Sequence, residues 1–504
     1  MAVVMDPFTL ACFKPECALL ELRNEGFEDA LTTFMPHMLL VESAWRGLDG
    51  SWRDKIHPAS PDLRYLVDCC RRRGIPTVFW NKEDPAHFDH FIEAAGLFDH
   101  VFTTDADCID RYQQMLGHDR VHLLTFGCQP RLHHPVEDFE RREAVSFAGS
   151  WYHQYPERCR DFDEVMRGIG DLLPVDIYDR NADRGDPRFE FPSRYRPMLR
   201  GTLSYDEIDR AYKGYEFSIN INTITNSSSM FSRRVYELMA SNTLVISNVS
   251  KALSSVFGGL VISGGADAIS SRLEALIHDD QARRRLRLRA LRAVLRSHTC
   301  AYRLSTVAEM VLGRSMEISD AAIVVVSEVK DVATASMLVG TFRSQSWPRR
   351  RLVLVTTTAD GFEKLHGKDV SVINADQANH LLPKDEWSGE WVAFWHPSDH
   401  YGEHYLTDLA LATNWADVPV AGKGRRYVWR EGVVTLATGY AYAKPQPLWL
   451  RSSLVRPDEL GNYTLSHYLG RLRLSDAPEL VGLATDEFNY CKYGAGRSVE
   501  VVDI

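Results

Sequence analysis

Short apolar runs alternate with amphipathic stretches along most of the chain. In the N-terminal part, apolar runs at 38–42, 77–80, 100–103 and 121–124 predict buried strands. Helical spacing of apolar residues lies between them, at 61–73 and 105–116. Strands that alternate with helices predict a parallel sheet covered on both faces.

The same alternation continues after a polar stretch at 128–142, which contains Pro130 and Pro135 and is interpreted as a linker. The predicted strands then lie at 145–148, 175–178, 217–222, 244–247 and 260–262. The predicted helices lie at 157–168, 204–214, 232–241 and 268–277. The chain is therefore expected to contain two consecutive Rossmann-like units that face each other across a cleft.

A third alternating region follows. Its predicted strands are 321–327, 352–356, 370–373 and 391–395, and its first helix is 332–343. The predicted fold class is α/β, with three domains. They span residues 1–140, 141–315 and 316–504.

Composition limits the class of protein. The chain has 504 residues, of which 45% are hydrophobic and 25% charged, values typical of a folded protein. A net charge of −10 argues against a nucleic-acid partner. The nine cysteines are scattered and form no CxxC pair, which favours reduced thiols and a cytoplasmic location. No apolar run of ~18 residues and no signal-peptide pattern is found, so no transmembrane segment is expected.

An arginine-rich segment at 280–296 has two interpretations. Its seven arginines are interspersed with leucines at helical spacing, which favours an amphipathic helix with a solvated basic face. The alternative is attraction to anionic lipid or to a phosphorylated acceptor, which would make the protein peripheral to a membrane.

Ligands in open α/β sheets bind at the carboxyl ends of strands, which directs attention to the loops there. The loop after 145–148 begins with Gly149 and Ser150, and Tyr152 follows. A glycine at this point allows a phosphate to approach the backbone, at the N-terminus of the next helix. A tight strand–helix turn explains the glycine equally well.

The loop from Asn222 carries the best local signal. A serine run precedes Arg233 and Arg234, which fall in the first turns of the next helix, where cations oppose the helix dipole. A bound diphosphate would explain them, and Glu237 would then accept hydrogen bonds from ribose. The alternative is a simple i,i+4 ion pair between Glu237 and Arg233.

In the first unit, a loop after 77–80 gathers charged side chains. Glu83 and His87 are candidate general bases, and Asp84 before a proline is interpreted mainly as a helix N-cap. Trp45 lies at another strand end and could stack on a sugar ring or simply cap the sheet. The predicted acceptor-binding residues are Trp45, Arg46, Asn81 and Lys82.

Taken together, the motifs resemble a GT-B glycosyltransferase of the spore-maturation (CgeB-like) group, which is related to the group-one glycosyltransferases. The matching segments are VESAWRG at 41–47, FWNKEDP at 79–85 with His87-Phe88, FTTD at 102–105, FAGSWY at 147–152, SMFSRRVYE at 229–237, and His298-Thr299 with Arg303. They span nearly all of residues 1–312 in the expected order.

This resemblance implies that the second unit binds a nucleotide-diphosphate sugar and the first unit an acceptor, without a required metal. Arg234 would contact the diphosphate and Glu237 the ribose, and a helix near 302–312 would cross back to close the first unit. The donor-binding residues are expected to be Gly149, Ser150, Tyr152, Asn222, Ser229, Arg233, Arg234 and Glu237. The group-one family usually shows two glutamates eight positions apart, the first near the donor sugar. Here the first of these positions is Ser229 and the second is Glu237.

The third region resembles a GT-A module of the family-two glycosyltransferases, on FRSQSWP at 342–348 and the strand after it. Such modules hold a divalent cation with an Asp-rich motif. The corresponding HPSDHY at 396–401 offers one carboxylate, Asp399. We expect no metal there, and an accessory role in acceptor binding or dimerisation.

The sequence thus predicts a glycosyltransferase that acts on a glycan, a glycolipid or a small molecule, as in the synthesis of cell-surface polysaccharide. The alternative, suggested by Ser229 and the incomplete acidic motif, is a non-catalytic sugar- or nucleotide-binding assembly protein. The donor nucleotide and sugar, the acceptor, the stereochemical outcome, the activity of the third module and a homodimeric state all stay open.

Overall fold

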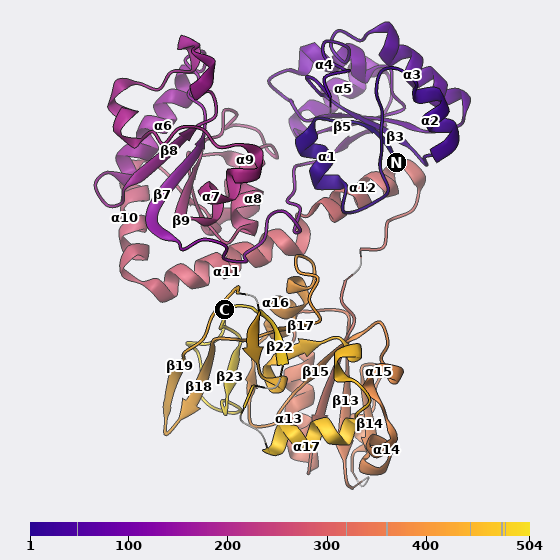
Figure 1. Cartoon of the computed structure of the whole chain (residues 1–504), viewed down its shortest axis with the longest axis vertical. Helices are drawn as coiled ribbons and strands as arrows, with labels where there is room; N and C mark the ends of the chain where they lie inside the picture. Colours follow the sequence, from indigo (N-terminus) through magenta and orange to yellow (C-terminus); the bar gives the residue numbers. More distant parts are fainter. Residues whose placement is uncertain (48, 319, 359–360, 444, 475–476, 479) are drawn as a thin grey trace. The chain divides into compact units, whose positions relative to one another are not determined.

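The computed structural model describes residues 1–504 except 48, 319, 359–360, 444, 475–476 and 479. The chain forms two compact units, Met1–Ile318 and Ser319–Ile504 (Figure 1), and each is described by itself.

The first lobe of the first unit is built on a six-stranded parallel sheet in the order β2-β1-β3-β4-β5-β6. Its central strands β1, β3 and β4 are fully buried and largely apolar, which is typical of a parallel sheet covered on both faces. The elements are β1 (Ala2–Val4), α1 (Pro7–Phe13), β2 (Leu20–Glu21), α2 (Phe27–Phe34), β3 (Leu39–Glu42), α3 (Pro61–Arg72), β4 (Thr77–Asn81), α4 (Phe88–Ala95), β5 (His100–Thr103), α5 (Ile109–Leu116) and β6 (Val121–Leu123).

The second lobe has a five-stranded parallel sheet in the order β11-β10-β9-β7-β8. The chain runs from β7 outward to β8 and then returns to the other side of β7, so the strand order reverses between β7 and β9. The elements are β7 (Arg142–Gly149), α6 (Pro156–Ile169), β8 (Val175–Asp179), α7 (Ile208–Lys213), β9 (Tyr215–Asn220), α8 (Arg234–Ala240), β10 (Leu244–Ser247), α9 (Lys251–Phe257), β11 (Ile262–Ser263), α10 (Ala266–His278) and α11 (Asp280–Ser297).

The last helix of the first unit, α12 (Cys300–Leu312), returns to the first lobe. Its Cys300, Leu304 and Val307 join the core on one face of the first sheet, together with Leu10 and Phe13 of α1. The first lobe therefore completes its core with a segment that follows the second lobe in sequence.

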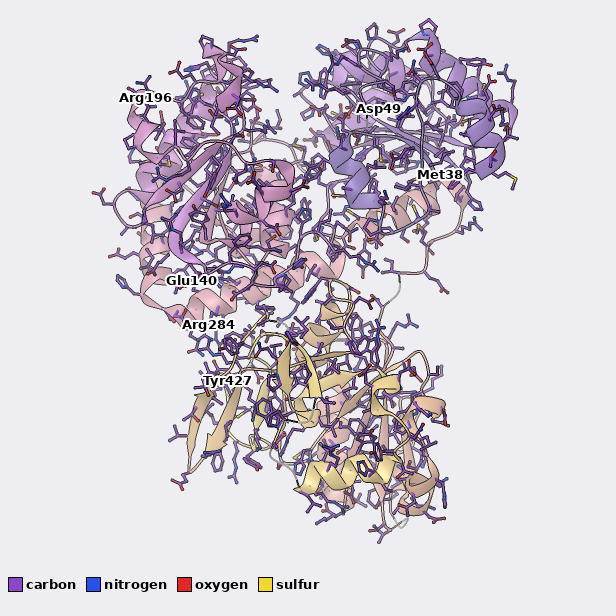
Figure 2. All side chains as sticks on the ribbon, viewed as in Figure 1. Met38, Asp49, Glu140, Arg196, Arg284 and Tyr427 are labelled. Carbon is purple, nitrogen blue, oxygen red and sulfur yellow. The ribbon has the colours of Figure 1, made fainter. Side chains whose placement is uncertain are left out.

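The second unit contains an eight-stranded mixed sheet in the order β14-β13-β12-β15-β21-β17-β22-β20 and a four-stranded sheet in the order β16-β23-β18-β19. Figure 2 draws the side chains of this unit, and one core cluster packs Val324, Val326 and Phe394 of the larger sheet with Leu465 and Leu469. The helices are α13 (Val332–Arg343), α14 (Ala375–His380), α15 (Pro383–Glu386), α16 (Tyr405–Ala412) and α17 (Leu465–Leu474). The strands are β12 (Ile323–Glu328), β13 (Arg350–Thr356), β14 (Val370–Asn374), β15 (Trp391–Phe394), β16 (His400–Tyr401), β17 (Val420–Gly422), β18 (Arg426–Arg430), β19 (Val433–Ala437), β20 (Gln446–Leu448), β21 (Ser453–Val455), β22 (Leu480–Ala484) and β23 (Tyr490–Lys492). Among the described residues, no helix combines the length and apolarity needed to cross a membrane.

The prediction of an α/β fold with two parallel Rossmann-like sheets and a further α/β region is confirmed. The polar stretch at 128–142 connects β6 to β7, as expected of a linker, and its first part is packed, because Cys128 forms a β-bridge with Thr299 and Gln129 and His133 are buried. One interpretation needs correction. The arginines of α11 are not all solvated, because Arg283 and Arg284 pair with Asp280 and Arg287 pairs with Glu216.

We predict that Gly168→Ala destabilises the first unit. A Cβ at Gly168 of α6 would lie 2.8 Å from the carbonyl oxygen of Ala266 and 2.8 Å from Cβ of Ile269, where α6 packs against α10. Overpacking of this kind costs about 1–3 kcal/mol, which exceeds the gain in helix propensity of about 1 kcal/mol. Gly340→Ala in α13 is the control, because nothing lies within 4 Å of its added Cβ. Thermal unfolding should show a lower transition for the first variant only; an unchanged transition would contradict the packing argument.

Candidate functional site

A cavity of about 620 Å³ lies where the strand order of the second lobe reverses. Ala148 and Gly149 at the end of β7 form one side, and the segment from Ile221 to Ile224 after β9 forms another. The crevice at such a reversal is the usual ligand-binding position in an open α/β sheet, and the volume is in the range of small-molecule sites.

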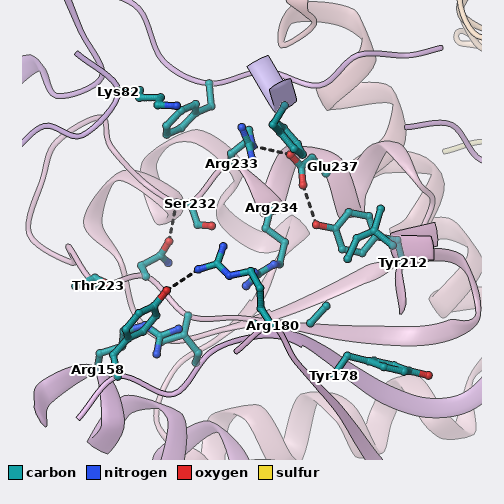
Figure 3. Close-up of a pocket in the computed structure, with 18 of the residues that line it drawn as sticks. Lys82, Arg158, Tyr178, Arg180, Tyr212, Thr223, Ser232, Arg233, Arg234 and Glu237 are labelled. Atoms are coloured by element: carbon teal, nitrogen blue, oxygen red, sulfur yellow. Dashed lines mark hydrogen bonds and ion pairs between the residues drawn. The ribbon is translucent and has the colours of Figure 1, made fainter. Parts of the chain in front are cut away.

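The first lobe contributes the remaining wall through Phe8, Lys82, Glu83 and Phe126. These residues come from α1 and from the loops after β4 and β6. The cavity is therefore shared by both lobes of the first unit (Figure 3).

Arg158, in the first turn of α6, is the most unusual charge in the lining. Its side chain is buried, with 6% of the residue exposed. Its guanidinium donates to the carbonyl of Ser150 at 2.9 Å and lies 4.9 Å from the ring centre of Tyr152. Burial, together with the nearby charge of Arg234, lowers the pKa of Arg158 to about 10.

Two further guanidinium groups reach the same part of the cavity, those of Arg180 and Arg234 (Figure 3). Arg180 donates to the hydroxyl of Tyr152 at 2.5 Å. Nε of Arg234 is buried and has no hydrogen-bond acceptor among the described residues, and its guanidinium lies 5.6 Å from the ring of Phe147.

These three arginines lack counter-charges. Across the described part of the chain, no carboxylate lies within ion-pair distance of Arg158, Arg180 or Arg234. Like charges that converge in a partly buried site repel one another, and a buried cation without a partner is costly. A bound anion would remove both penalties.

Arg233 and Glu237 satisfy each other instead. Nε of Arg233 lies 2.8 Å from Oε1 of Glu237, and the hydroxyl of Tyr212 donates to Oε2 at 2.8 Å. The guanidinium of Arg233 also lies 3.1 Å from the ring centre of Phe8, which comes from the first lobe. Burial opposes ionisation of Glu237, but Arg233 and its other neighbours hold its pKa below the ordinary value. The ion pair between Arg233 and Glu237, one of the two interpretations of this segment, is therefore present, and both residues line the cavity.

Other predicted donor residues divide into two groups. Gly149, Tyr152 and Asn222 line the cavity, but Gly149 has a packing reason as well, since an added Cβ would lie 2.5 Å from the ring of Phe147. Ser150 lies outside the lining and is buried, with its hydroxyl accepting from the amide of Asn181 at 2.9 Å.

The serine run joins the two lobes rather than lining the cavity. Ser229 accepts from the backbone N–H of Ala106 at 2.8 Å and donates to the carbonyl of Thr104. Ser228 donates to Asp107 at 2.6 Å through its hydroxyl and at 3.1 Å through its N–H. We call these contacts, with that of Ser227 to Asp105 at 2.7 Å, the serine clasp. The hydroxyl of Ser229 therefore contacts the backbone of the first lobe in this structure, instead of making the predicted contact with a donor.

Of the predicted first-lobe residues, Lys82 and Glu83 line the cavity. Lys82 is already paired, because its Nζ lies 2.9 Å from both Asp6 and Glu42. Burial opposes the charge of Lys82, but these two carboxylates raise its pKa above the ordinary value.

The other predicted first-lobe residues lie outside the lining. Asn81 is buried and donates to Asp84 at 2.8 Å and to Tyr112 at 2.9 Å. Trp45 is 45% exposed and packs edge-on against His87, with ring centres 5.5 Å apart. Arg46 is exposed. The structure thus separates these residues from the cavity that Lys82 and Glu83 reach.

Asp84 is not a helix cap, which corrects the sequence interpretation. Residues 82–87 form turns, so α4 begins only at Phe88 and His87 occupies its N-cap position. Asp84 is buried and accepts hydrogen bonds from Thr103 at 2.6 Å and from Asn81. Burial raises the pKa of Asp84 to about 7.

In the second unit, the carboxylate of Asp399 is held by protein groups. Arg451 contacts both of its oxygens at 2.6 Å, and the hydroxyl of Tyr490 and the N–H of Tyr493 donate to it at 2.8 and 2.9 Å. His400 pairs with Asp503. Of the residues that the structure describes, no three His, Cys, Asp or Glu gather in a way that could hold a metal ion.

Arg158 and Arg180 are functional candidates that the sequence reading missed. Arg158 carries the same signal that identified Arg233 and Arg234, a cation in the first turn of a helix against the dipole. Arg180 directly follows β8, at the carboxyl edge of the sheet.

Comparison with protein families finds one match, which falls mainly in the second lobe. Residues 179–309, from the end of β8 into α12, match a family model described as glycosyl transferase-like. The second lobe thus carries a glycosyl transferase-like segment, which includes Arg180, Arg234 and Glu237. No curated protein matches the chain in sequence.

Solved structures show only distant likeness. A UDP-forming α,α-trehalose-phosphate synthase from Burkholderia xenovorans has 11% identity over 57% of this chain and 77% of its own, with a TM-score of 0.37. A glycosyltransferase from Rickettsia africae ESF-5 has 10% identity over 61% and 88%, with a TM-score of 0.40. A DNA-modifying β-glucosyltransferase has 10% identity over 62% and 97%, with a TM-score of 0.39.

We predict that Asp84 makes the first lobe less stable as pH rises from about 4 to about 7. Its pKa in the folded protein, about 7, is above the ordinary value of 3.8, so the folded state binds more protons in this window. Urea unfolding at pH 5 and pH 8 measures the effect. Asp84→Asn should flatten the pH dependence, and an equal dependence in both proteins would contradict the assignment.

We also predict that Asp107→Ala loosens the loop after β9. The substitution removes both hydrogen bonds to Ser228, which anchor the segment that leads to Arg233. Hydrogen–deuterium exchange of residues 223–232 should become faster. Asp110→Ala, at an exposed position of α5, is the control and should leave exchange unchanged. Equal exchange in all three proteins would show that the serine clasp does not hold the loop.

Proposed function

We propose that the first unit transfers a sugar from a nucleotide-diphosphate sugar to an acceptor hydroxyl. The observation that carries the proposal is the set of unpaired guanidinium groups of Arg158, Arg180 and Arg234 in one cavity. The match of residues 179–309 to a glycosyl transferase-like family supports the same reaction class.

The donor would lie in the crevice between β7 and β9, with its diphosphate at the three arginines. The diphosphate of a nucleotide sugar is esterified at both ends and carries about two negative charges. Three guanidinium groups compensate these charges without a bound metal ion. In the reaction, the bond between the anomeric carbon and the phosphate oxygen breaks. The nucleoside diphosphate leaves with one more negative charge, which the guanidinium groups stabilise.

Glu237 would bind the ribose hydroxyls of the donor. It lines the cavity, Oε1 contacts Arg233 and Oε2 accepts from Tyr212, and each oxygen keeps a lone pair for a hydroxyl donor. Arg233 would hold this carboxylate ionised and oriented through their ion pair. The ring of Phe8 contacts the guanidinium of Arg233 and fixes its position further.

The acceptor would enter from the first lobe, near Glu83. Glu83 lines the cavity and comes from the first lobe, whereas the three arginines come from the second. It would accept the proton of the acceptor hydroxyl as the new glycosidic bond forms, unless the leaving phosphate takes that proton. His87 lies outside the lining, which favours Glu83 of the two candidate bases.

Binding of UDP, GDP and dTDP to purified protein tests the donor site. We predict that Arg158→Met weakens the tightest of these at least 10-fold, because a hydrogen bond between charged groups contributes about 1.5–3 kcal/mol. Arg160→Met is the matched control, since Arg160 is an exposed arginine of the same helix. Isothermal titration calorimetry measures the dissociation constants.

Three outcomes separate the alternatives. Equal affinity in the wild type and Arg158→Met, or no binding of any of the three nucleotides, would contradict the donor site. Nucleotide binding without consumption of any nucleotide-sugar would favour a non-catalytic binding protein. Turnover that falls about 10²-fold or more in Glu83→Gln, with nucleotide affinity retained, would support the assignment of the base.

A further inference from the structure

The second unit has a cavity of its own, of about 420 Å³. It lies at the carboxyl ends of β12 and β15, lined by Glu328 at the end of β12 and by Trp395 and His396 after β15. The chain runs from β12 outward to β13 and β14, and then returns to the other side of β12 as β15. The cavity therefore occupies the reversal of strand order in this sheet, where ligands bind in open α/β sheets.

The charges that line this cavity are balanced, in contrast to the cavity of the first unit. Glu328 pairs with Arg473 of α17 at 3.1 Å. Lys330 and Asp331 follow Glu328 in the lining and carry opposite charges. Nδ1 of His396 and the hydroxyl of Ser398 share a hydrogen bond of 2.7 Å. The lining therefore has no excess charge of either sign that would attract a ligand with a large net charge.

A phosphate group is disfavoured by the start of α13. Asp331 is the N-cap of this helix, and its carboxylate accepts from the N–H and the hydroxyl of Thr334 at 2.8 and 2.9 Å. A negative charge thus already occupies the position where an anion would bind a helix N-terminus. The carboxylate of Asp399 is likewise taken up by Arg451 and Tyr490.

Three apolar side chains also line the cavity and form its apolar wall, those of Met337 of α13 and of Leu469 and Leu472 of α17. Polar groups of both hydrogen-bonding kinds therefore share the lining with an apolar surface. Sugar rings match this arrangement, because they carry hydroxyl groups around the edge and C–H groups on the faces.

We propose that the cavity in the second unit binds a neutral saccharide. Carboxylate and ammonium groups at the strand ends hold the sugar hydroxyls, and the side chains of α13 and α17 cover a face of the ring. The cavity is large enough for one or two rings. This site is independent of the transfer reaction proposed for the first unit.

Saturation-transfer-difference NMR on the full-length protein tests the proposal. The probes are the methyl glycosides of glucose, galactose, mannose, N-acetylglucosamine and rhamnose, with UMP and inorganic phosphate as anionic competitors. We expect signals from at least one glycoside that neither anion displaces. Met337→Trp, which places an indole in the cavity from a position that is 44% exposed, should reduce these signals at least fivefold.

The control is Met310→Trp in α12, where the methionine is also 44% exposed, and it should keep the signals. Glu328→Gln provides a second variant that leaves the apolar wall intact and should also weaken the signals. The absence of any glycoside signal, glycoside signals unchanged in both variants, or displacement of the glycoside by UMP would overturn the proposal. Arg158→Met should leave glycoside binding unchanged, so a failure of the donor site and a failure of this site are distinguishable.

Discussion

The arrangement of the first unit depends on the point where the chain crosses back from the second lobe to the first. Cys128 and Thr299 lie side by side as a β-bridge, and Cys128 exchanges backbone hydrogen bonds with His298 and Cys300. Arg303 then donates to the carbonyls of Thr125 and Phe126 at 2.9 and 2.8 Å. The outgoing and returning segments are thus tied together at one place. Gly127 is required there, since a Cβ would lie 2.8 Å from the carbonyl oxygen of His298.

This junction explains why the cavity of the first unit has walls from both lobes. With α12 in the core of the first lobe, the loops after β4 and β6 face the carboxyl edge of the second sheet. The serine clasp and the contact of Arg233 with Phe8 add polar and aromatic links between the same edges. Residues far apart in sequence, such as Glu83 and Arg234, line one cavity because backbone pairing at the junction limits how the lobes can move.

The strands and most helices could be predicted because parallel strands and the helices that cover them have regular apolar patterns. The pattern at 332–343 coincides with α13, and that at 244–247 with β10. The polar contacts could not be predicted in the same way. Asp84 has the sequence environment of a helix cap, yet its carboxylate is fixed by Thr103, nineteen positions away. Ser229 has the position of a donor ligand, yet its hydroxyl is satisfied by the backbone of another lobe.

The two cavities show why charge balance is more informative than cavity shape. Both lie at reversals of strand order, so the backbone topology alone does not distinguish their ligands. In the first, Arg158 is buried without a counter-ion, which lowers the stability of the protein in the absence of a ligand. Residues that reduce stability in this way are typical of functional sites, because the ligand restores the missing interaction. In the second, Glu328 and Arg473 already neutralise each other, and a ligand gains binding energy only by hydrogen bonding and contact with the apolar wall. The charge balance therefore supports the proposal of an anionic ligand for the first cavity and of a neutral saccharide for the second.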